Sequence, residues 1–359
     1  MKRQGIIEIE PLRRRIGKQE GILLLGSCFA DEMGERLAAA GYKVMSNPFG
    51  TLYNPVSIAQ AMQIIGAETF TPLAKEDTEL FTYGIGCKRY GSYLFNTKAS
   101  RESPEEFLSY ANSTIEAARH FFKESATIIV TLGTAWVYKH IGKQMIVANC
   151  HKVPAKEFSR YRLSIDETLA ALKEITAFPG KQYIFTVSPI RHLADGEHGN
   201  QLSKATLLLA TDALISQAAA QASQALQAAP AAPALQATPA SQAAQAAPAA
   251  LQVPQAAQPS QAAQAAPAAP ASQATPATQA AQAAPAALHT SPAELQPSPV
   301  ASQTPPAAGK EATSIYYFPA YEIVMDELRD FRHYAEDTVH PSAETAEYIF
   351  SRFSANCLK

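Results

Sequence analysis

The 359-residue sequence lacks the features that mark several common classes of protein. Its 30 Lys and Arg residues nearly balance 32 Asp and Glu residues, so no excess of basic side chains predicts binding to nucleic acid. No apolar run is long enough to span a membrane. Glu8 and Glu10 interrupt the apolar part of the N-terminal stretch, which argues against a signal peptide. We therefore expect a soluble, cytoplasmic protein with no membrane span.

Cysteine is also scarce, and its spacing predicts free thiols. The four cysteines are far apart and form neither a disulfide framework nor a CxxC zinc motif. His192, Asp195 and His198 lie in one loop but lack a fourth ligand at regular spacing, so we predict no metal. No GxGxxG motif or P-loop is present, and we predict no cofactor.

Charge is absent altogether from one long stretch. No Asp, Glu, Lys or Arg lies between Asp212 and Glu294, and the nine-residue unit QAAQAAPAA recurs from Gln242, Gln261 and Gln279. Frequent proline breaks any helix there, and Ala offers little apolar surface to bury. We predict that residues 216–309 are a disordered, low-complexity insertion.

The remaining pieces, 1–215 and 310–359, have the size of one α/β domain. Aliphatic runs of strand length alternate with helical patterns: strands are expected at 22–25, 43–45, 127–132, 183–187 and 315–318, with an edge strand at 6–9. Helices are expected at 31–40, 56–66, 104–124, 164–177, 201–215 and 341–352. This order predicts a doubly wound, mostly parallel sheet.

Polar, turn-rich sequence follows each expected strand. These stretches read GSCF, NPFGTLYN, LGTAWVY, SPIRH and DTVHPS. In a parallel sheet the carboxyl ends of the strands meet at one edge, where ligands bind. We therefore expect one site built from these loops, although each alone reads as an ordinary connection.

Several of these motifs resemble the GSCFA group of the SGNH (GDSL-type) hydrolase superfamily. The resemblance rests on GSCFA from Gly26, the NPFGTLYNP loop, the SPIRH…DG…NQLSKA run and Asp337-Thr338-Val339-His340. It covers 1–215 and 310–359 but not the insertion. It implies a flavodoxin-like three-layer α/β/α sandwich with ester hydrolase or acyl-transfer chemistry on a small acyl or ester substrate.

The same resemblance implies roles for individual residues. His340 would be the general base and Asp337 would orient it. Aligning Gly-Ser-Cys-Phe with Gly-Asp-Ser-Leu places Cys28 at the nucleophile position, which departs from the superfamily's serine. We therefore favour Cys28 as the nucleophile, and Ser27 stays the alternative. A helix N-terminus and an imidazolium should lower the pKa of Cys28, whereas Asp31 and Glu32 should oppose this.

Donors for an oxyanion are less clear from the sequence. Gly50 fits the superfamily's glycine, but Ala135 stands where an asparagine is expected. Thr134, Asn54 or Asn149 would then have to supply a donor, and His192 is a candidate for contacting substrate.

Two further hypotheses stay open at this point. The same fold could be a non-catalytic module that binds a carbohydrate or acyl ligand, or the protein could act through its insertion. The oligomeric state is not predicted.

Overall fold

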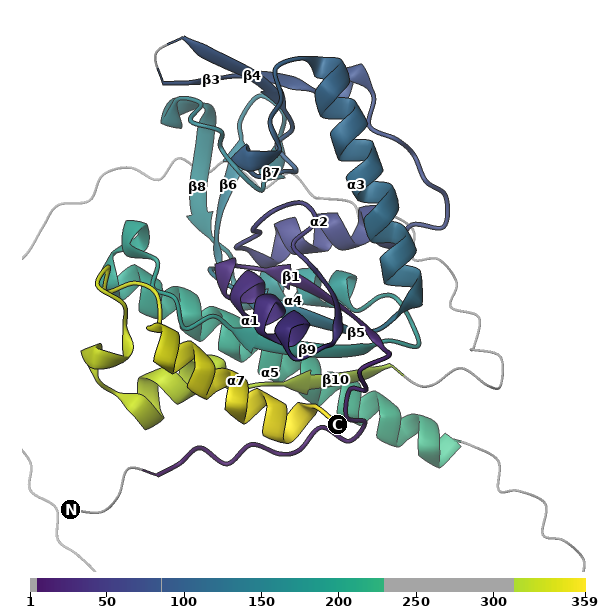
Figure 1. Ribbon diagram of the computed structural model, residues 1–359, viewed down its shortest axis with the longest axis vertical. Coiled ribbons are helices and arrows are strands. Elements are labelled where there is room, and N and C mark those ends of the chain that lie inside the picture. Colours follow the sequence, from purple (N-terminus) through teal and green to yellow (C-terminus); the bar gives the residue numbers. More distant parts are fainter. Residues whose placement is uncertain (1–4, 85, 229–312) are drawn as a thin grey trace, which may run out of the picture. The chain divides into compact units, whose positions relative to one another are not determined.

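The computed structural model describes residues 5–84, 86–228 and 313–359, with backbone alone for 225–228. A five-stranded parallel sheet lies at its centre (Figure 1), in the order β10-β9-β5-β1-β2. Its strands are β1 (Gly21–Gly26), β2 (Lys43–Ser46), β5 (Ser125–Leu132), β9 (Gln182–Val187) and β10 (Ser314–Tyr317). Counting only these strands along the chain, the order is 2-1-3-4-5, as in flavodoxin-like folds.

Helices cover both faces of this sheet, which confirms the predicted three-layer α/β/α architecture. One face packs against α2 (Pro55–Gly66), α3 (Pro104–Glu124), α4 (Ile165–Ile175) and α5 (Gly196–Ala228). The other packs against α1 (Cys28–Ala39), a π-helix (Ile323–Leu328) that follows the short α6 (Ala320–Glu322), and α7 (Ala343–Cys357).

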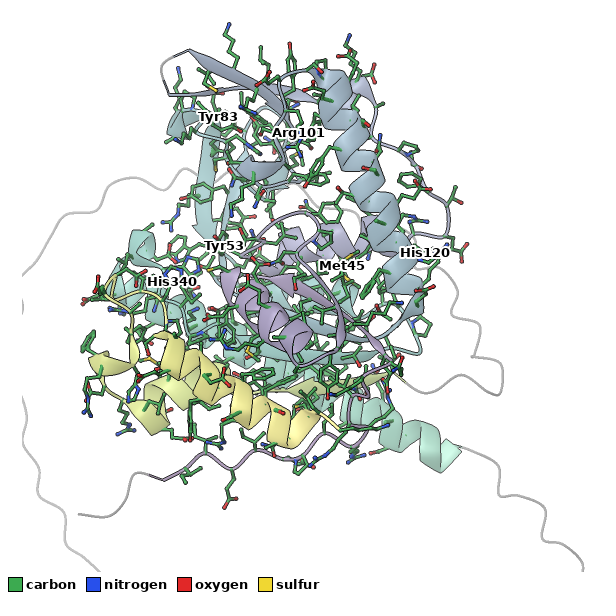
Figure 2. The ribbon with its side chains drawn as sticks, in the orientation of Figure 1. Met45, Tyr53, Tyr83, Arg101, His120 and His340 are labelled. Atoms are coloured by element: carbon green, nitrogen blue, oxygen red, sulfur yellow. The ribbon has the colours of Figure 1, made fainter. Side chains whose placement is uncertain are left out.

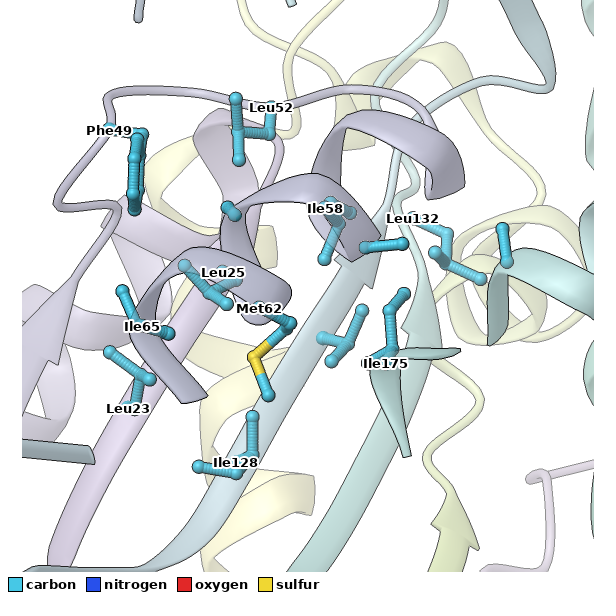
Figure 3. Close-up of a cluster of buried hydrophobic side chains, with 14 of the residues drawn as sticks. Leu23, Leu25, Phe49, Leu52, Ile58, Met62, Ile65, Ile128, Leu132 and Ile175 are labelled. Atoms are coloured by element: carbon cyan, nitrogen blue, oxygen red, sulfur yellow. The ribbon is translucent and has the colours of Figure 1, made fainter. Parts of the chain in front are cut away.

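The continuous aliphatic run of β1 is explained by burial on both faces. Leu23 and Leu25 point to the layer of α2 and α3, whereas Ile22 and Leu24 point to that of α1 and α7. Successive side chains of a strand alternate between faces, so a strand between two helical layers needs apolar residues at every position. Figure 3 shows Leu23 and Leu25 beside Met62 of α2 in the first of these layers.

Two smaller sheets were not expected from the sequence. β3 (Glu79–Tyr83) and β4 (Cys87–Gly91) form a hairpin, and β6 (Trp136–His140) pairs with β7 (Met145–Val147) and β8 (Phe158–Arg162). Phe81 of the hairpin, Tyr93, Val147 and Phe158 share a small apolar core between the two sheets. Figure 1 shows all five strands beyond the central sheet, on the side of α3.

The edge strand predicted at residues 6–9 is wrong. This segment has no strand partner, and side chains bind its backbone instead. The Ile7 N–H donates to Glu327 Oε2 at 3.0 Å, and the Ile7 carbonyl accepts from Arg352. The alternation of Ile and Glu thus reflects one apolar side packed on α7, without a neighbouring strand.

The predicted start of the insertion falls within a helix. The structure continues α5 to Ala228, beyond the expected end at Ile215. The rest of the segment 216–309, from 229 on, lies outside the described residues, and its disorder stays a prediction.

Gly26 is the position at which the sheet least tolerates a side chain. Its φ is +142°, and a Cβ there would lie 2.1 Å from the Thr131 carbonyl oxygen of β5. We expect Gly26→Ala to lower the free energy of unfolding by at least about 3 kcal/mol, because β1 and β5 would have to separate. Urea unfolding followed by circular dichroism measures this change.

The matched control is Gly142→Ala, since a Cβ at Gly142 meets no atom closer than 3.5 Å and its backbone is unstrained. Equal stability of the two variants would contradict the packing described here.

Candidate active site

The turn that follows β1 positions the first candidate side chain. Ser27 is the N-cap of α1, and Cys28 is the first residue of the helix. The Ser27 N–H donates to the Thr131 carbonyl at 3.1 Å, which ties the turn to β5. Because a helix leaves its first N–H groups without internal acceptors, those of Cys28 and Phe29 are free to face an anion.

The structure brings Cys28, His340 and Asp337 together. Cys28 Sγ lies 3.6 Å from His340 Nε2, and His340 Nδ1 lies 2.6 Å from Asp337 Oδ2. Because an ionised carboxylate only accepts hydrogen bonds, we assign the imidazole proton to Nδ1. The unprotonated Nε2 then faces the thiol, in the orientation that a general base needs. Figure 2 shows His340 near the carboxyl end of the sheet.

The loop that carries His340 is shaped by Asp337 itself. Asp337 Oδ1 accepts from the N–H groups of Val339 at 2.9 Å and His340 at 3.0 Å. Together with the bond to the His340 ring, these contacts lower the pKa of Asp337 to about 2. The Asp-x-x-His spacing thus lets one carboxylate orient both the loop and the imidazole.

Ser27 does not reach this site. The residue is only 1% exposed, and its Oγ is buried without a hydrogen-bond partner among the described residues. The two adjacent side chains leave the turn in different directions, as expected. Of the two candidate nucleophiles, only Cys28 contacts the histidine.

The expectation that the helix N-terminus and the imidazolium lower the pKa of Cys28 is wrong. Burial raises this pKa above its ordinary value, and the carboxylates of Asp31 and Glu32 raise it further. The N–H groups of Cys28 and Phe29 lower the pKa of Cys28, but burial outweighs their effect. The resting site therefore holds a neutral thiol beside an imidazole that can accept its proton.

Asn47 supports the turn and was missed by the sequence analysis. It follows β2 with a φ of +42°. Its Oδ1 accepts from the Gly26 N–H at 2.8 Å, and its Nδ2 donates to Asp31 Oδ1 at 2.8 Å. One amide thus joins the end of β1 to the first turn of α1. The tolerance of asparagine for positive φ is the only signal that could have identified it.

Gly50 and Asn54 both take part in hydrogen bonds within their own loop. The Gly50 N–H donates to the Asn47 carbonyl at 2.7 Å, and a Cβ at Gly50 would lie 2.1 Å from the Asn96 side chain. Asn54 caps α2: its Oδ1 accepts from the Ser57 N–H and its Nδ2 donates to Ser57 Oγ. Both residues have structural roles in the loop.

Thr134 is likewise engaged in a structural network. Its Oγ1 donates to Asp195 Oδ2 at 3.1 Å and lies 2.9 Å from Ser203 Oγ, while its N–H donates to the Tyr53 carbonyl. Ala135, at the position where an asparagine was expected, is fully buried in the core. The hydroxyl of Thr134 holds the loop after β5 against α5.

His192 and Tyr53 lie next to each other beside this loop. Their rings meet edge to face at 5.4 Å. His192 Nε2 is buried and has no hydrogen-bond partner in the described part of the chain. Burial lowers the pKa of His192 to about 4, and the charges of Lys204 and Arg160 contribute. A neutral histidine with an unused nitrogen can hydrogen-bond to a substrate oxygen.

Lys204 is a second group that the sequence analysis did not identify. It is 1% exposed, and its Nζ donates to the carbonyls of Gly133 and Ser188, each at 2.7 Å. These carbonyls follow β5 and β9, so one ammonium group joins the ends of two strands. Burial lowers the pKa of Lys204 to about 7, whereas the charge of Asp195 opposes this shift. A lysine on the inward face of an apolar helix pattern is the signal that could have revealed it.

The remaining candidates lie elsewhere. Asn149 accepts from the His151 N–H at 2.8 Å, and His151 bridges Tyr83 to the Ser92 and Phe95 carbonyls inside the smaller sheets. Asp195 pairs with Arg160. Among the residues that the structure describes, no cluster of three or more His, Cys, Asp or Glu side chains could hold a metal ion.

The turn at Gly26–Ala30 has the sequence GSCFA, and comparison with known proteins finds a family of that name. The GSCFA family matches residues 21–223 and 301–353, which is more than half of the chain. The chain belongs to the GSCFA family. No curated protein and no solved structure matches it. Within the described ranges of this GSCFA chain, no helix is both long and apolar enough to cross a bilayer.

The contact between Cys28 and His340 leads to a prediction for thiol reactivity. If His340 accepts the Cys28 proton, removing the imidazole should slow alkylation by iodoacetamide. We expect about a tenfold slower reaction of Cys28 near neutral pH in His340→Ala, because thiolate is the reacting form. Peptide mass spectrometry of the labelled GSCFA protein measures each cysteine separately.

Cys87 is the internal control, because it is exposed and its rate should not change. An unchanged ratio of the Cys28 and Cys87 rates would contradict proton transfer between Cys28 and His340.

The buried, neutral His192 makes stability depend on pH. Its pKa falls from the ordinary 6.5 to about 4 on folding, so the unfolded chain binds more protons between these values. Stability is therefore lost as the pH falls through this window. Between neutral pH and about pH 4, we expect the native protein to lose up to about 3 kcal/mol more than His192→Gln. Urea unfolding at the two pH values tests this, and equal losses would show that His192 is already solvated.

Proposed function

We infer that this protein is an SGNH-type ester hydrolase or acyltransferase with Cys28 as its nucleophile. The observation that carries this proposal is the line of contacts from Cys28 Sγ through the His340 ring to Asp337. Membership of the GSCFA family supports it, as does the resemblance of the Gly26–Phe29 and Asp337–His340 motifs to that superfamily.

Acylation follows from this geometry. His340 Nε2 takes the thiol proton as Cys28 Sγ attacks the carbonyl carbon of an ester, and Asp337 stabilises the resulting imidazolium. The tetrahedral intermediate then collapses: the bond to the leaving alcohol breaks, and His340 returns the proton to the departing oxygen. The product is a thioester on Cys28.

Deacylation uses the same histidine in reverse. His340 removes a proton from water or from an acceptor hydroxyl, whose oxygen attacks the thioester carbonyl. The thiolate leaves and regains its proton from His340. Hydrolysis and acyl transfer differ only in which hydroxyl enters this second step.

We assign stabilisation of the oxyanion to the start of α1 rather than to Gly50, Asn54 or Thr134. The N–H groups of Cys28 and Phe29 already favour negative charge on the sulfur. They lie at the start of α1, where the helix dipole favours an anion as well. His192 Nε2, which has no other partner among the described residues, is our candidate for contacting the substrate. We assign this activity to one domain, 1–215 with 310–359.

A binding module without catalysis is the second candidate function. It is favoured by the raised pKa of Cys28 and by the engagement of Gly50, Asn54 and Thr134 in structural hydrogen bonds. Such a module would hold an acyl or carbohydrate ligand in the same place.

Hydrolysis of p-nitrophenyl acetate distinguishes these functions. For an enzyme, we expect Cys28→Ala and His340→Ala to lose at least about 10³-fold in kcat/KM, because both belong to one catalytic unit. Mass spectrometry should find an acetyl group on Cys28 during turnover.

Ser27→Ala is the matched control, since the Ser27 hydroxyl is buried and has no hydrogen-bond partner within the part of the chain that the structure describes. Its kcat/KM should stay within about twofold of the native value. Loss of activity in Ser27→Ala, or full activity in Cys28→Ala, would overturn the assignment of the nucleophile. No turnover in any variant, with equal thermal stabilisation of native protein and Cys28→Ala by the ester, would favour the binding module.

A further inference from the structure

A cavity of ≈ 180 Å³ lies next to the proposed active site but does not include Cys28 or His340. Its walls come from the loop after β9, the first turns of α5, the π-helix and the segment 329–334. The π-helix is an uncommon element that often occurs at functional sites. The π-helix ends at Leu328. The next residue, Arg329, has a left-handed backbone conformation and also lines the cavity.

Several hydrogen-bond donors that line this cavity are unused. Asn200 accepts from the His192 N–H through Oδ1, and Gln201 accepts from the Tyr321 hydroxyl through Oε1. Within the described residues, neither amide nitrogen has an acceptor. The Tyr334 hydroxyl donates only to Met325 Sδ, at 3.7 Å, and a thioether is a weak acceptor. The amide nitrogens of Asn200 and Gln201 therefore leave donors that a ligand can use.

The charges around the cavity leave one cation poorly compensated. Arg329 pairs with Asp326 at 3.2 Å, and Asp330 pairs with Arg332 at 2.8 Å. Among the described residues, Arg191 pairs with Glu197 alone, at 3.9 Å; the Glu197 side chain is 89% exposed, and such a pair is weak. The Arg191 side chain is itself 23% exposed. Its guanidinium is thus the positive charge available to a ligand.

The rest of the wall is apolar. Val324 and Met325 line it, as does Phe331, whose ring lies 5.9 Å from the Arg191 guanidinium. Phe331 is 72% exposed, which is high for a phenylalanine, and its ring lies 6.2 Å from that of Tyr334. A concave, largely apolar site with a few convergent donors is typical of small-molecule pockets.

We propose that this cavity binds a small organic carboxylate. The carboxylate pairs with Arg191 and accepts from Asn200, Gln201 or Tyr334, and the apolar body of the ligand packs against Val324, Met325 and Phe331. A guanidinium and a carboxylate form strong, charge-assisted hydrogen bonds. Inorganic anions fill only the polar end, so the apolar wall selects an organic acid.

The cavity is mechanically linked to the loop of the proposed active site. The Arg191 N–H donates to the Val339 carbonyl at 3.2 Å, and its guanidinium donates to the Thr338 carbonyl at 3.4 Å. Both acceptors lie between Asp337 and His340. His192, the next residue after Arg191, packs its ring against that of Tyr53. The proposal concerns binding alone and does not depend on the chemistry of Cys28.

The test measures the affinity of the full chain for 4-phenylbutyrate and for its neutral analogue 4-phenylbutanamide, by ligand-observed NMR titration. We expect the carboxylate to bind about tenfold more tightly than the amide. Arg191→Gln should remove this preference, whereas Arg89→Gln, a matched change on the β3–β4 hairpin, should preserve it.

Two further variants keep the result interpretable. Tyr334→Phe removes only a hydroxyl and should weaken carboxylate binding about threefold, even if Arg191→Gln folds poorly. Cys28→Ala should bind 4-phenylbutyrate as the native protein does, which separates this proposal from the proposed function. Absence of binding, equal affinity for acid and amide, or tight binding of inorganic phosphate in place of the organic acid would each overturn the proposal.

Discussion

The close contact between the end of β1 and the backbone of β5 determines the geometry of the site. Only a glycine fits at position 26, since a Cβ there would meet the Thr131 carbonyl oxygen at 2.1 Å. That contact, together with the Asn47 amide, makes the chain turn sharply and begin α1 at Cys28. The thiol consequently lies at a helix N-terminus, at the switch point of the parallel sheet, facing the loop that carries His340.

Burial disfavours the charged forms of three groups around this site. Burial raises the pKa of Cys28 and lowers those of His192 and Lys204, to about 4 and about 7. The pKa of the exposed Asp337 is lowered instead, because three hydrogen bonds stabilise its charge. Charge separation therefore occurs when a reaction moves the thiol proton to His340. The N–H groups at the start of α1 are oriented to stabilise the resulting thiolate, and the Asp337 carboxylate is oriented to stabilise the imidazolium.

The sequence predicted the architecture and the Cys28–His340–Asp337 group but not the details around them. Buried parallel strands have a distinctive pattern, and polar residues at their carboxyl ends must converge. The roles of Gly50, Asn54 and Thr134 could not be predicted, because each depends on which local hydrogen bond the folded loop completes. The pKa of Cys28 depends on burial by distant segments. β4 escaped detection because its sequence, CKRYG, has no apolar pattern.

Cys28 and His340 are separated by 312 positions in the chain, and this separation affects the dynamics of the site. His340 belongs to the segment that follows β10, and β10 is an edge strand paired only with β9 within the described sheet. Opening of this segment would break no other strand pair of the central sheet, but it would expose Ile349, Phe353 and Cys357 of α7, which are buried in the core. The thiol–imidazole pair therefore exists only while the C-terminal segment stays packed on this face of the sheet.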